Sequence, residues 1–213
     1  MLLDHLERAL GELHSTTVVE EVGRLGSIGV LRFTDVPVAG AVTYVTFGLS
    51  RAELHVDPER HVRLELMLSL EDEEEPFAPT VWLVMLAEHF GDGGVAPRHA
   101  EVHRVGPLAD GSALEGFALV PPVRFGGDFA RLELPDDVPV DILELIPLST
   151  VEAGFVRAHG WDEFVDVIRR NDPNLLDLRR PPLLERRPRA AGRPDEYVEL
   201  DGSPVPRRRT GEG

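Results

Sequence analysis

The stretch VDILELIPLSTVEAGFVRAHGWDEFVDVIRRNDP, residues 140–173, carries the clearest signal of the fold. Its first part is a nearly unbroken apolar run, which predicts a strand covered on both faces. Ser149 and Glu152 then stand three apart, and this spacing predicts a capping box, in which hydroxyl and carboxylate satisfy backbone donors at a helix start. Gly160 predicts the end of that helix, because a residue without Cβ readily adopts the left-handed conformation.

A second helix is predicted directly after the first. Trp161, Phe164, Val165 and Ile168 recur at i, i+3, i+4 and i+7 and form one apolar stripe. The proline that closes the stretch ends this helix. Because Trp161 lies on the stripe, it is predicted to belong to the core. The stretch as a whole predicts a strand that leads into a helical hairpin.

Strand and helix patterns also occur upstream of this stretch. Apolar residues at helical spacing predict helices over 2–14 and 80–90, and the second is apolar on every side, which predicts a position central to the core. The segment LELMLSL (64–70) alternates strictly between leucine and other residues, the pattern of a half-buried strand. Further strands are predicted at 18–22, 28–33, 43–49, 102–105, 114–120 and 129–134.

The composition excludes several kinds of chemistry. The chain has 213 residues, enough for one well-buried core, and contains no Cys, which excludes disulfides, thiolate catalysis and cysteine-based metal sites. All its basic residues are Arg, so lysine-based catalysis is excluded as well. No apolar run approaches the roughly 20 residues that cross a bilayer, and the N-terminus lacks the basic start of a signal peptide. The sequence therefore predicts a cytoplasmic protein without a membrane partner.

The charge of the chain is strongly negative and uneven. The net charge of −16 argues against nucleic acid as a partner, since phosphate recognition needs a basic surface. Residues 179–213 hold nine Arg and six acids, whereas residues 1–178 hold thirteen Arg and thirty-two acids. The densest acidic run is Glu71, Asp72, Glu73, Glu74 and Glu75. Such a run is usually a solvated loop, but as part of an acidic surface it would steer and dock a basic partner protein.

Four segments, in this order, resemble the suppressor-of-fused domain. They are VTYVTFGLS (42–50), LELMLSL (64–70), GSALEGFALVPP (111–122) and the opening stretch from residue 143, continued by NLLDLRRP (174–181). Their order and spacing cover residues 38–181. The resemblance implies an α+β fold, with a mixed β-sheet packed with helices in a single suppressor-of-fused-like domain. Residues 1–37 would pack on this domain as a helix and strands, and the Pro- and Arg-rich residues 182–213 are expected to form a largely disordered tail.

The resemblance also implies a protein that binds other proteins. The family's members are not known as enzymes. In animals the domain is half of a cytoplasmic regulator that grips a transcription factor of the Hedgehog pathway, and small bacterial relatives are proposed to be immunity proteins that neutralise toxins. We expect no second domain like that of the animal protein, so transcription-factor binding is not carried over. The length, acidity and all-Arg composition resemble the bacterial group, and neither a catalytic residue nor a cofactor is predicted.

Two other classes of function stay open. His55, Asp57 and His61 bracket one predicted loop, and His99 and His103 stand four residues apart. Imidazole and carboxylate suit zinc, so either group would support a metal-dependent hydrolase. A polar hairpin loop and an extended segment between prolines explain the same residues without a metal, so no metal site is predicted. The other alternative is a regulatory module that binds transcription machinery.

Ser50 is the remaining catalytic candidate. It follows Gly48 and Leu49, as in a nucleophile elbow, but Ala52 stands where the second glycine of that motif belongs. A hydrolase built on Ser50 is therefore not predicted. The leading hypothesis is a bacterial immunity or antitoxin protein that binds a basic toxin directly, with residues 71–75 as the partner-binding surface and no prediction of oligomeric state.

Overall fold

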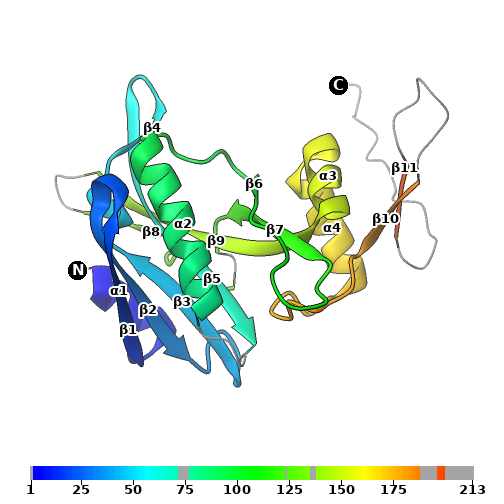
Figure 1. Cartoon of the computed structure of the whole chain (residues 1–213), viewed down its shortest axis with the longest axis horizontal. Coiled ribbons are helices and arrows are strands. Elements are labelled where there is room, and N and C mark those ends of the chain that lie inside the picture. The colour runs from blue at the N-terminus through cyan, green and yellow to red at the C-terminus, as the bar shows by residue number, and fades with distance from the viewer. Residues whose placement is uncertain (1, 72–76, 123, 135–137, 188–195, 200–213) are drawn as a thin grey trace. The chain divides into compact units, whose positions relative to one another are not determined.

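The computed structural model describes residues 2–71, 77–122, 124–134, 138–187 and 196–199 (Figure 1). The chain forms two compact units: unit 1 comprises residues 1–101 and 119–146, and unit 2 comprises residues 102–118 and 147–213. No helix in the described ranges combines the length and the apolar character that crossing a bilayer requires.

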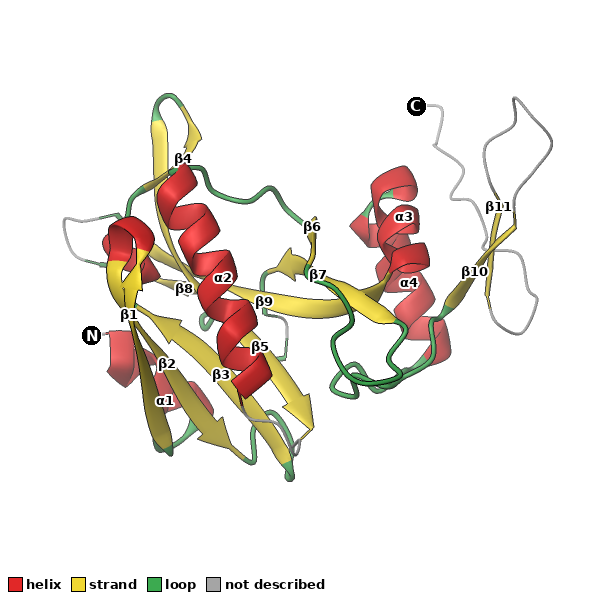
Figure 2. Ribbon diagram, in the orientation of Figure 1, coloured by secondary structure: helices red, strands yellow, loops and turns green. Residues whose placement is uncertain are grey.

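Unit 1 is built on a mixed β-sheet (Figure 2). Its strands lie in the order β1-β2-β3-β5-β9, of which the first four pair antiparallel, whereas β9 runs parallel to β5. Short β4 pairs with β5 and short β8 pairs with β9. The bounds are α1 Leu2–Leu10, β1 Ser15–Val22, β2 Gly26–Thr34, β3 Ala41–Phe47, β4 Leu54–Asp57, β5 Arg60–Glu71, α2 Phe77–Gly93, β8 Arg131–Leu132 and β9 Val140–Ser149.

Helices cover both faces of this sheet. Leu6 and Leu10 of α1 pack into one cluster with side chains of β2, β3, β5 and β9. Helix α2 crosses β2, β3 and β5 on the opposite face (Figure 2). The last turn of α2 lies close to the short 3-10 helix η1 (Gly23–Leu25), since a Cβ on Gly91 would come 2.7 Å from Leu25. The predicted α+β fold, a mixed sheet packed with helices, is confirmed.

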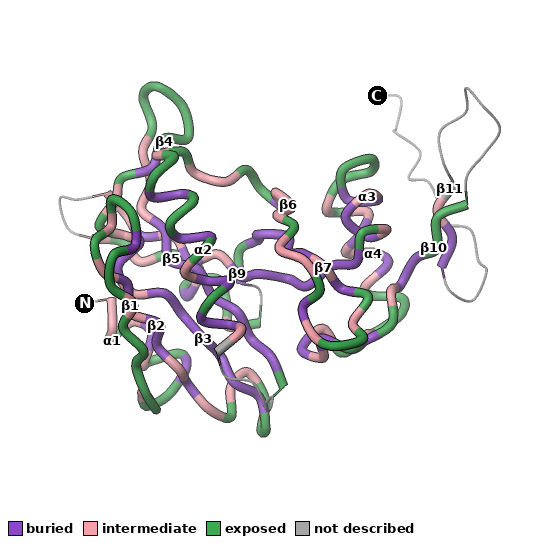
Figure 3. The backbone as a smooth tube through the Cα atoms, viewed as in Figure 1, coloured by how far each residue is buried: buried purple, intermediate pink, exposed green. Residues whose placement is uncertain are grey.

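Two predictions about burial in unit 1 are wrong. Strand β5 is not half-buried: every residue from 64 to 70 is buried, because β5 has neighbouring strands on both sides and helices on both faces (Figure 3). Helix α2 is not buried all round either. Val81 and Met85 are 51% and 49% exposed, because only one side of the helix rests on the sheet.

Unit 2 contains the predicted helical hairpin. Its elements are β6 Glu101–Arg104, β7 Leu114–Val120, α3 Thr150–His159, α4 Trp161–Asn171, β10 Leu184–Arg187 and β11 Glu196–Glu199. The capping box at the start of α3 is present, with Ser149 N donating to Glu152 at 2.7 Å and Glu152 N donating to Ser149 at 3.2 Å. Gly160, at φ 91°, separates the two helices as predicted.

The apolar stripe of α4 is displaced from its predicted position. Phe164 and Val167 are buried, whereas Trp161 is only half-buried and stacks at a tilt on Phe164, with ring centroids 5.7 Å apart. The core side of the helix is therefore centred between the two buried residues, and the prediction that Trp161 belongs to the core is wrong.

Part of the predicted C-terminal tail is described. Strands β10 and β11 pair antiparallel, from Leu184 opposite Glu199 to Arg187 opposite Glu196. Leu184 and Val198 are buried. Residues 188–195 and 200–213 lie outside the described residues, so the expectation of disorder there stays a prediction.

Candidate functional site

A buried glutamate in unit 1 organises the loop that follows β3. Glu65 of β5 is fully buried and accepts hydrogen bonds from Thr46 Oγ1 (2.6 Å), Gly48 N (2.9 Å), Ser50 N (3.2 Å) and Ser50 Oγ (2.6 Å). Burial raises the pKa of Glu65, and the hydrogen bonds from Ser50, Thr46 and Gly48 oppose that rise. Thr46 lies near the end of β3 and Gly48 and Ser50 follow it, so the carboxylate fixes the shape of the chain where it leaves the strand.

The same geometry bears on the hydrolase candidate Ser50. A nucleophilic serine passes its proton to a base that is itself free to accept it. The Ser50 hydroxyl donates to a carboxylate that already receives two backbone amides and the hydroxyl of Thr46. The hydroxyl is thus one of several donors that stabilise Glu65, and the arrangement is structural.

A second buried carboxylate lies on β9. Glu144 is 2% exposed, and Arg124, in the loop after β7, lies with its Nη1 3.5 Å from Glu144 Oε1. Burial raises the pKa of Glu144, and the positive charge of Arg124 opposes that rise. The pair joins a loop to the sheet of unit 1.

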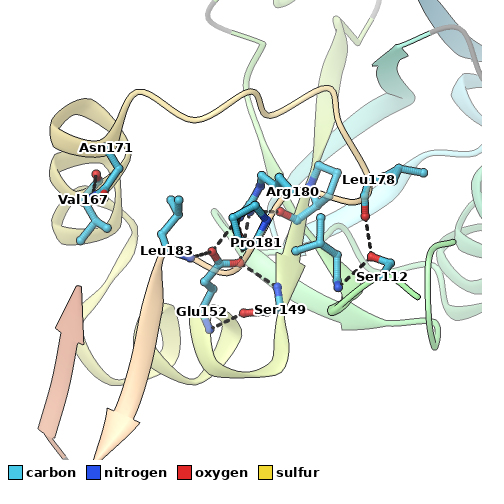
Figure 4. A network of polar contacts seen from close by, with 11 residues as sticks. Ser112, Ser149, Glu152, Val167, Asn171, Leu178, Arg180, Pro181 and Leu183 are labelled. Carbon is cyan, nitrogen blue, oxygen red and sulfur yellow. Dashed lines mark hydrogen bonds and ion pairs between the residues drawn. The ribbon is translucent and has the colours of Figure 1, made fainter. Parts of the chain in front are cut away.

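A buried polar network lies in unit 2 (Figure 4). Glu152 accepts from Arg180 Nη1 (2.8 Å), Arg180 Nη2 (3.1 Å) and Leu183 N (2.8 Å), besides its capping bond from Ser149. Arg180 also donates to the carbonyls of Pro147 and Pro181. Neither charged side chain is more than 3% exposed. The network therefore ties the start of α3 to the segment that leads into β10.

The first group of candidate metal ligands lies on the β4–β5 hairpin. The rings of His55 and His61 pack edge to face across the β4–β5 hairpin, with centroids 4.3 Å apart. Asp57 caps the hairpin turn, since its Oδ1 accepts from the backbone of Glu59 and Arg60. Among the described residues, no three His, Asp or Glu side chains gather closely enough to hold a metal ion.

His99 and His103 occupy different kinds of position. His99 precedes β6 and His103 lies within it, so the segment is extended toward its end, as its flanking prolines predict. Within the described ranges, His99 and His103 also belong to no group of three His, Asp or Glu side chains that could hold a metal ion.

The predicted partner-binding run lies almost wholly outside the described residues. Glu71 is the last residue of β5 and is exposed. Asp72, Glu73, Glu74 and Glu75 lie in the segment that is not described, so their role stays a prediction.

A surface that the sequence reasoning missed lies on α2. We call the exposed residues Val81, Met85, Glu88 and Asp92 the outer face of α2. Their spacing of four, three and four residues is the signal that places them on one side of a helix. The sequence does not distinguish this side of the helix, because the residues around Val81 and Met85 are apolar too.

Comparison with known proteins settles the family. The family model of the suppressor of fused protein matches residues 25–181. The chain belongs to the suppressor of fused family. The division into residues 1–37, 38–181 and 182–213 stays a prediction.

Solved structures of suppressor of fused proteins share the fold. A homolog from Neisseria gonorrhoeae is similar with a TM-score of 0.62 and 20% identity, over 85% of this chain and 93% of that one. The Sufu–Fu complex matches with a TM-score of 0.62 and 17% identity, over 85% of this chain and 90% of that one. Drosophila Suppressor of Fused matches with a TM-score of 0.61 and 16% identity, over 85% of this chain and 50% of that one. No curated protein sequence matches the chain.

Proposed function

We propose that this protein is a non-catalytic protein-binding module, and that it serves as a cytoplasmic bacterial immunity or antitoxin protein that neutralises a basic toxin by direct binding. Membership of the suppressor of fused family carries the proposal, because one solved relative is a complex with another protein. The net charge of −16 supports a basic partner, since complementary charge accelerates association and disfavours acidic competitors.

The buried carboxylates support a non-catalytic role. Glu65 and Glu152 each receive several hydrogen bonds from the chain itself, and Glu144 is paired with Arg124. A general acid or base must be able to reach a substrate proton. Carboxylates that hold loops and helix ends in place at full burial are poorly suited to that task.

Affinity purification of the tagged protein from its native host tests the proposal. The expected result is one stoichiometric partner with a basic isoelectric point, whose toxicity in a heterologous host is relieved by co-expression of this chain. Recovery of transcription machinery would instead favour a regulatory module. If several lysis conditions yield no stoichiometric partner, the proposal fails.

The acidic run allows a sharper test of the docking surface. Residues 71–75 are replaced together by Gln and Asn, which keeps side-chain size and removes five negative charges. If the run steers the partner, association should slow about tenfold or more at low salt, and its salt dependence should flatten. An unchanged association rate would remove this run from the proposed surface.

A further inference from the structure

The outer face of α2 combines two apolar residues with two acids in one line. Val81 and Met85, one turn apart, are about half exposed, and Glu88 and Asp92 continue the same side toward the C-terminal end of the helix. At 1.5 Å per residue, the line is roughly 16 Å long, or about three helical turns. Large apolar side chains that are spaced to share one helix face, and that are left exposed, are typical of a surface that another chain covers.

The charge at the end of this line is the reverse of what the helix itself favours. The C-terminus of a helix carries a partial negative charge, so basic residues are preferred there. The last turn of α2 contains no basic residue and contains Asp92, with Glu88 one turn earlier. The negative field of the helix end and of these carboxylates thus adds up in one place.

The acidic end is also hollowed. A shallow depression of about 560 Å³ is lined by Met85, Glu88, His89, Asp92 and Gly93. Asp92 is held in position there, because its Oδ1 accepts a hydrogen bond from the backbone of Arg24 at 2.8 Å. A flexible methionine beside Glu88 and the fixed carboxylate of Asp92 suits a long side chain with an apolar stem and a cationic head.

We propose that the outer face of α2 docks an amphipathic helix of the partner protein, which places two apolar residues on Val81 and Met85 and an Arg or Lys in the depression beside Glu88 and Asp92. The inference rests on the proposed protein-binding function and specifies its surface. Side chains at i, i+4 and i+7 form one ridge along α2, and a partner helix can pack along such a ridge.

A second copy of this chain fits the face less well. In an antiparallel two-fold pairing, Glu88 and Asp92 of each copy would lie against Val81 and Met85 of the other. Burying carboxylates against apolar side chains without a cation is unfavourable. Charge complementarity therefore selects a basic partner.

Synthetic peptides test this surface without knowledge of the natural partner. Three dye-labelled helical peptides of about 16 residues are used: a cationic probe with an apolar stripe and two Arg at one end, an anionic probe with Glu in place of those Arg, and a scrambled cationic probe without the stripe. Fluorescence anisotropy with the full chain should show the cationic probe binding at least about tenfold more tightly than either of the others.

Substitutions in the full chain then locate the binding. Met85→Glu should weaken the cationic probe about tenfold, and Glu88→Arg should weaken it by a similar factor while it strengthens the anionic probe. Val18→Glu, at a residue of β1 that is 62% exposed, is the matched control and should change neither probe. Circular dichroism must show the same melting temperature for all variants within a few degrees.

Three results with the probes and the variants would overturn the inference. They are equal binding of the cationic and scrambled probes, insensitivity to both α2 substitutions, and concentration-dependent dimerisation that Met85→Glu abolishes, which would make a second copy the occupant. A natural partner that binds the Met85→Glu, Glu88→Arg double variant normally would also refute this surface while leaving the proposed function intact. Failure to find any natural partner would count against the proposed function only.

Discussion

Replacing Arg180 by Met should destabilise the protein far more than its position in the C-terminal segment suggests. The substitution removes both hydrogen bonds from Arg180 to Glu152 and leaves a carboxylate that is 0% exposed with only the amides of Ser149 and Leu183. Breaking a buried ion pair in this way costs about 3–5 kcal/mol, because the remaining charge is uncompensated. That is a large part of the typical stability of a domain, about 5–15 kcal/mol.

Urea unfolding followed by far-UV circular dichroism and tryptophan fluorescence measures this cost. Arg169→Met is the matched control: Arg169 is on α4, its side chain is 72% exposed, and its Nη1 lies 3.3 Å from Oδ1 of Asp166 one turn earlier. An exposed pair of this kind contributes about 0.5 kcal/mol or less. A cost below about 1 kcal/mol for Arg180→Met would refute the reasoning.

A double-mutant cycle makes the test independent of the absolute cost. Glu152→Gln removes the buried negative charge, so adding it to Arg180→Met should be much less harmful than adding it to the wild type. We expect the two single costs to exceed the cost of the double variant by about 2 kcal/mol or more. If the single costs add within about 0.5 kcal/mol, the two side chains do not act as a pair.

Three further predictions follow from the structure. Burial raises the folded-state pKa of Glu144, so the stability that this residue contributes is present below its unfolded pKa, near 4.5, and is lost as the pH rises through the folded pKa. In urea unfolding, the wild type should therefore lose stability relative to Glu144→Gln across that pH window, and a difference that does not change with pH would contradict this. Gly160→Ala should lower the stability by roughly 1–3 kcal/mol, because φ of Gly160 is 91°. Gly127 has open space around it and no such φ, so Gly127→Ala should change the stability by about 0.5 kcal/mol or less, and equal effects of the two substitutions in thermal unfolding would exclude backbone strain. Trp161→Ala should lower the stability by roughly 1–3 kcal/mol, because Trp161 is half-buried and a fully buried aromatic costs about 3–5 kcal/mol. A loss outside roughly 1–3 kcal/mol in chemical unfolding would contradict the partial burial of Trp161.

The parts of the fold that the sequence predicted are those whose signals are local. The strand and helices of residues 140–173 follow from an apolar run, a capping box whose two residues stand three apart and a glycine between two helices. Each of these acts within one or two turns, so no knowledge of distant neighbours is needed. Strand β7 was predicted with its observed bounds for a similar reason.

The parts that the sequence did not predict depend on distant partners. Glu65 reads as the solvent side of an alternating strand, yet it is buried because Thr46 and Ser50, fifteen or more residues upstream, supply its donors. The sequence identifies Glu152 only as a capping residue, because its ion-pair partner Arg180 lies 28 residues away along the chain. The exposed side of α2 was invisible, since no local signal tells which side of an apolar helix meets the sheet.

The acids of this chain thus divide into two classes with different consequences for experiment. Glu65, Glu144 and Glu152 are buried and hold loops or helix ends, so their substitution changes stability and would alter binding without touching a partner. Glu88 is exposed, so its substitution is expected to leave the fold intact. A loss of binding therefore identifies a partner surface only when it comes from the exposed class. For this reason the charge reversal at Glu88, with melting temperature as the control, discriminates between a docking face and a folding defect, which a conventional scan of all acids would confuse.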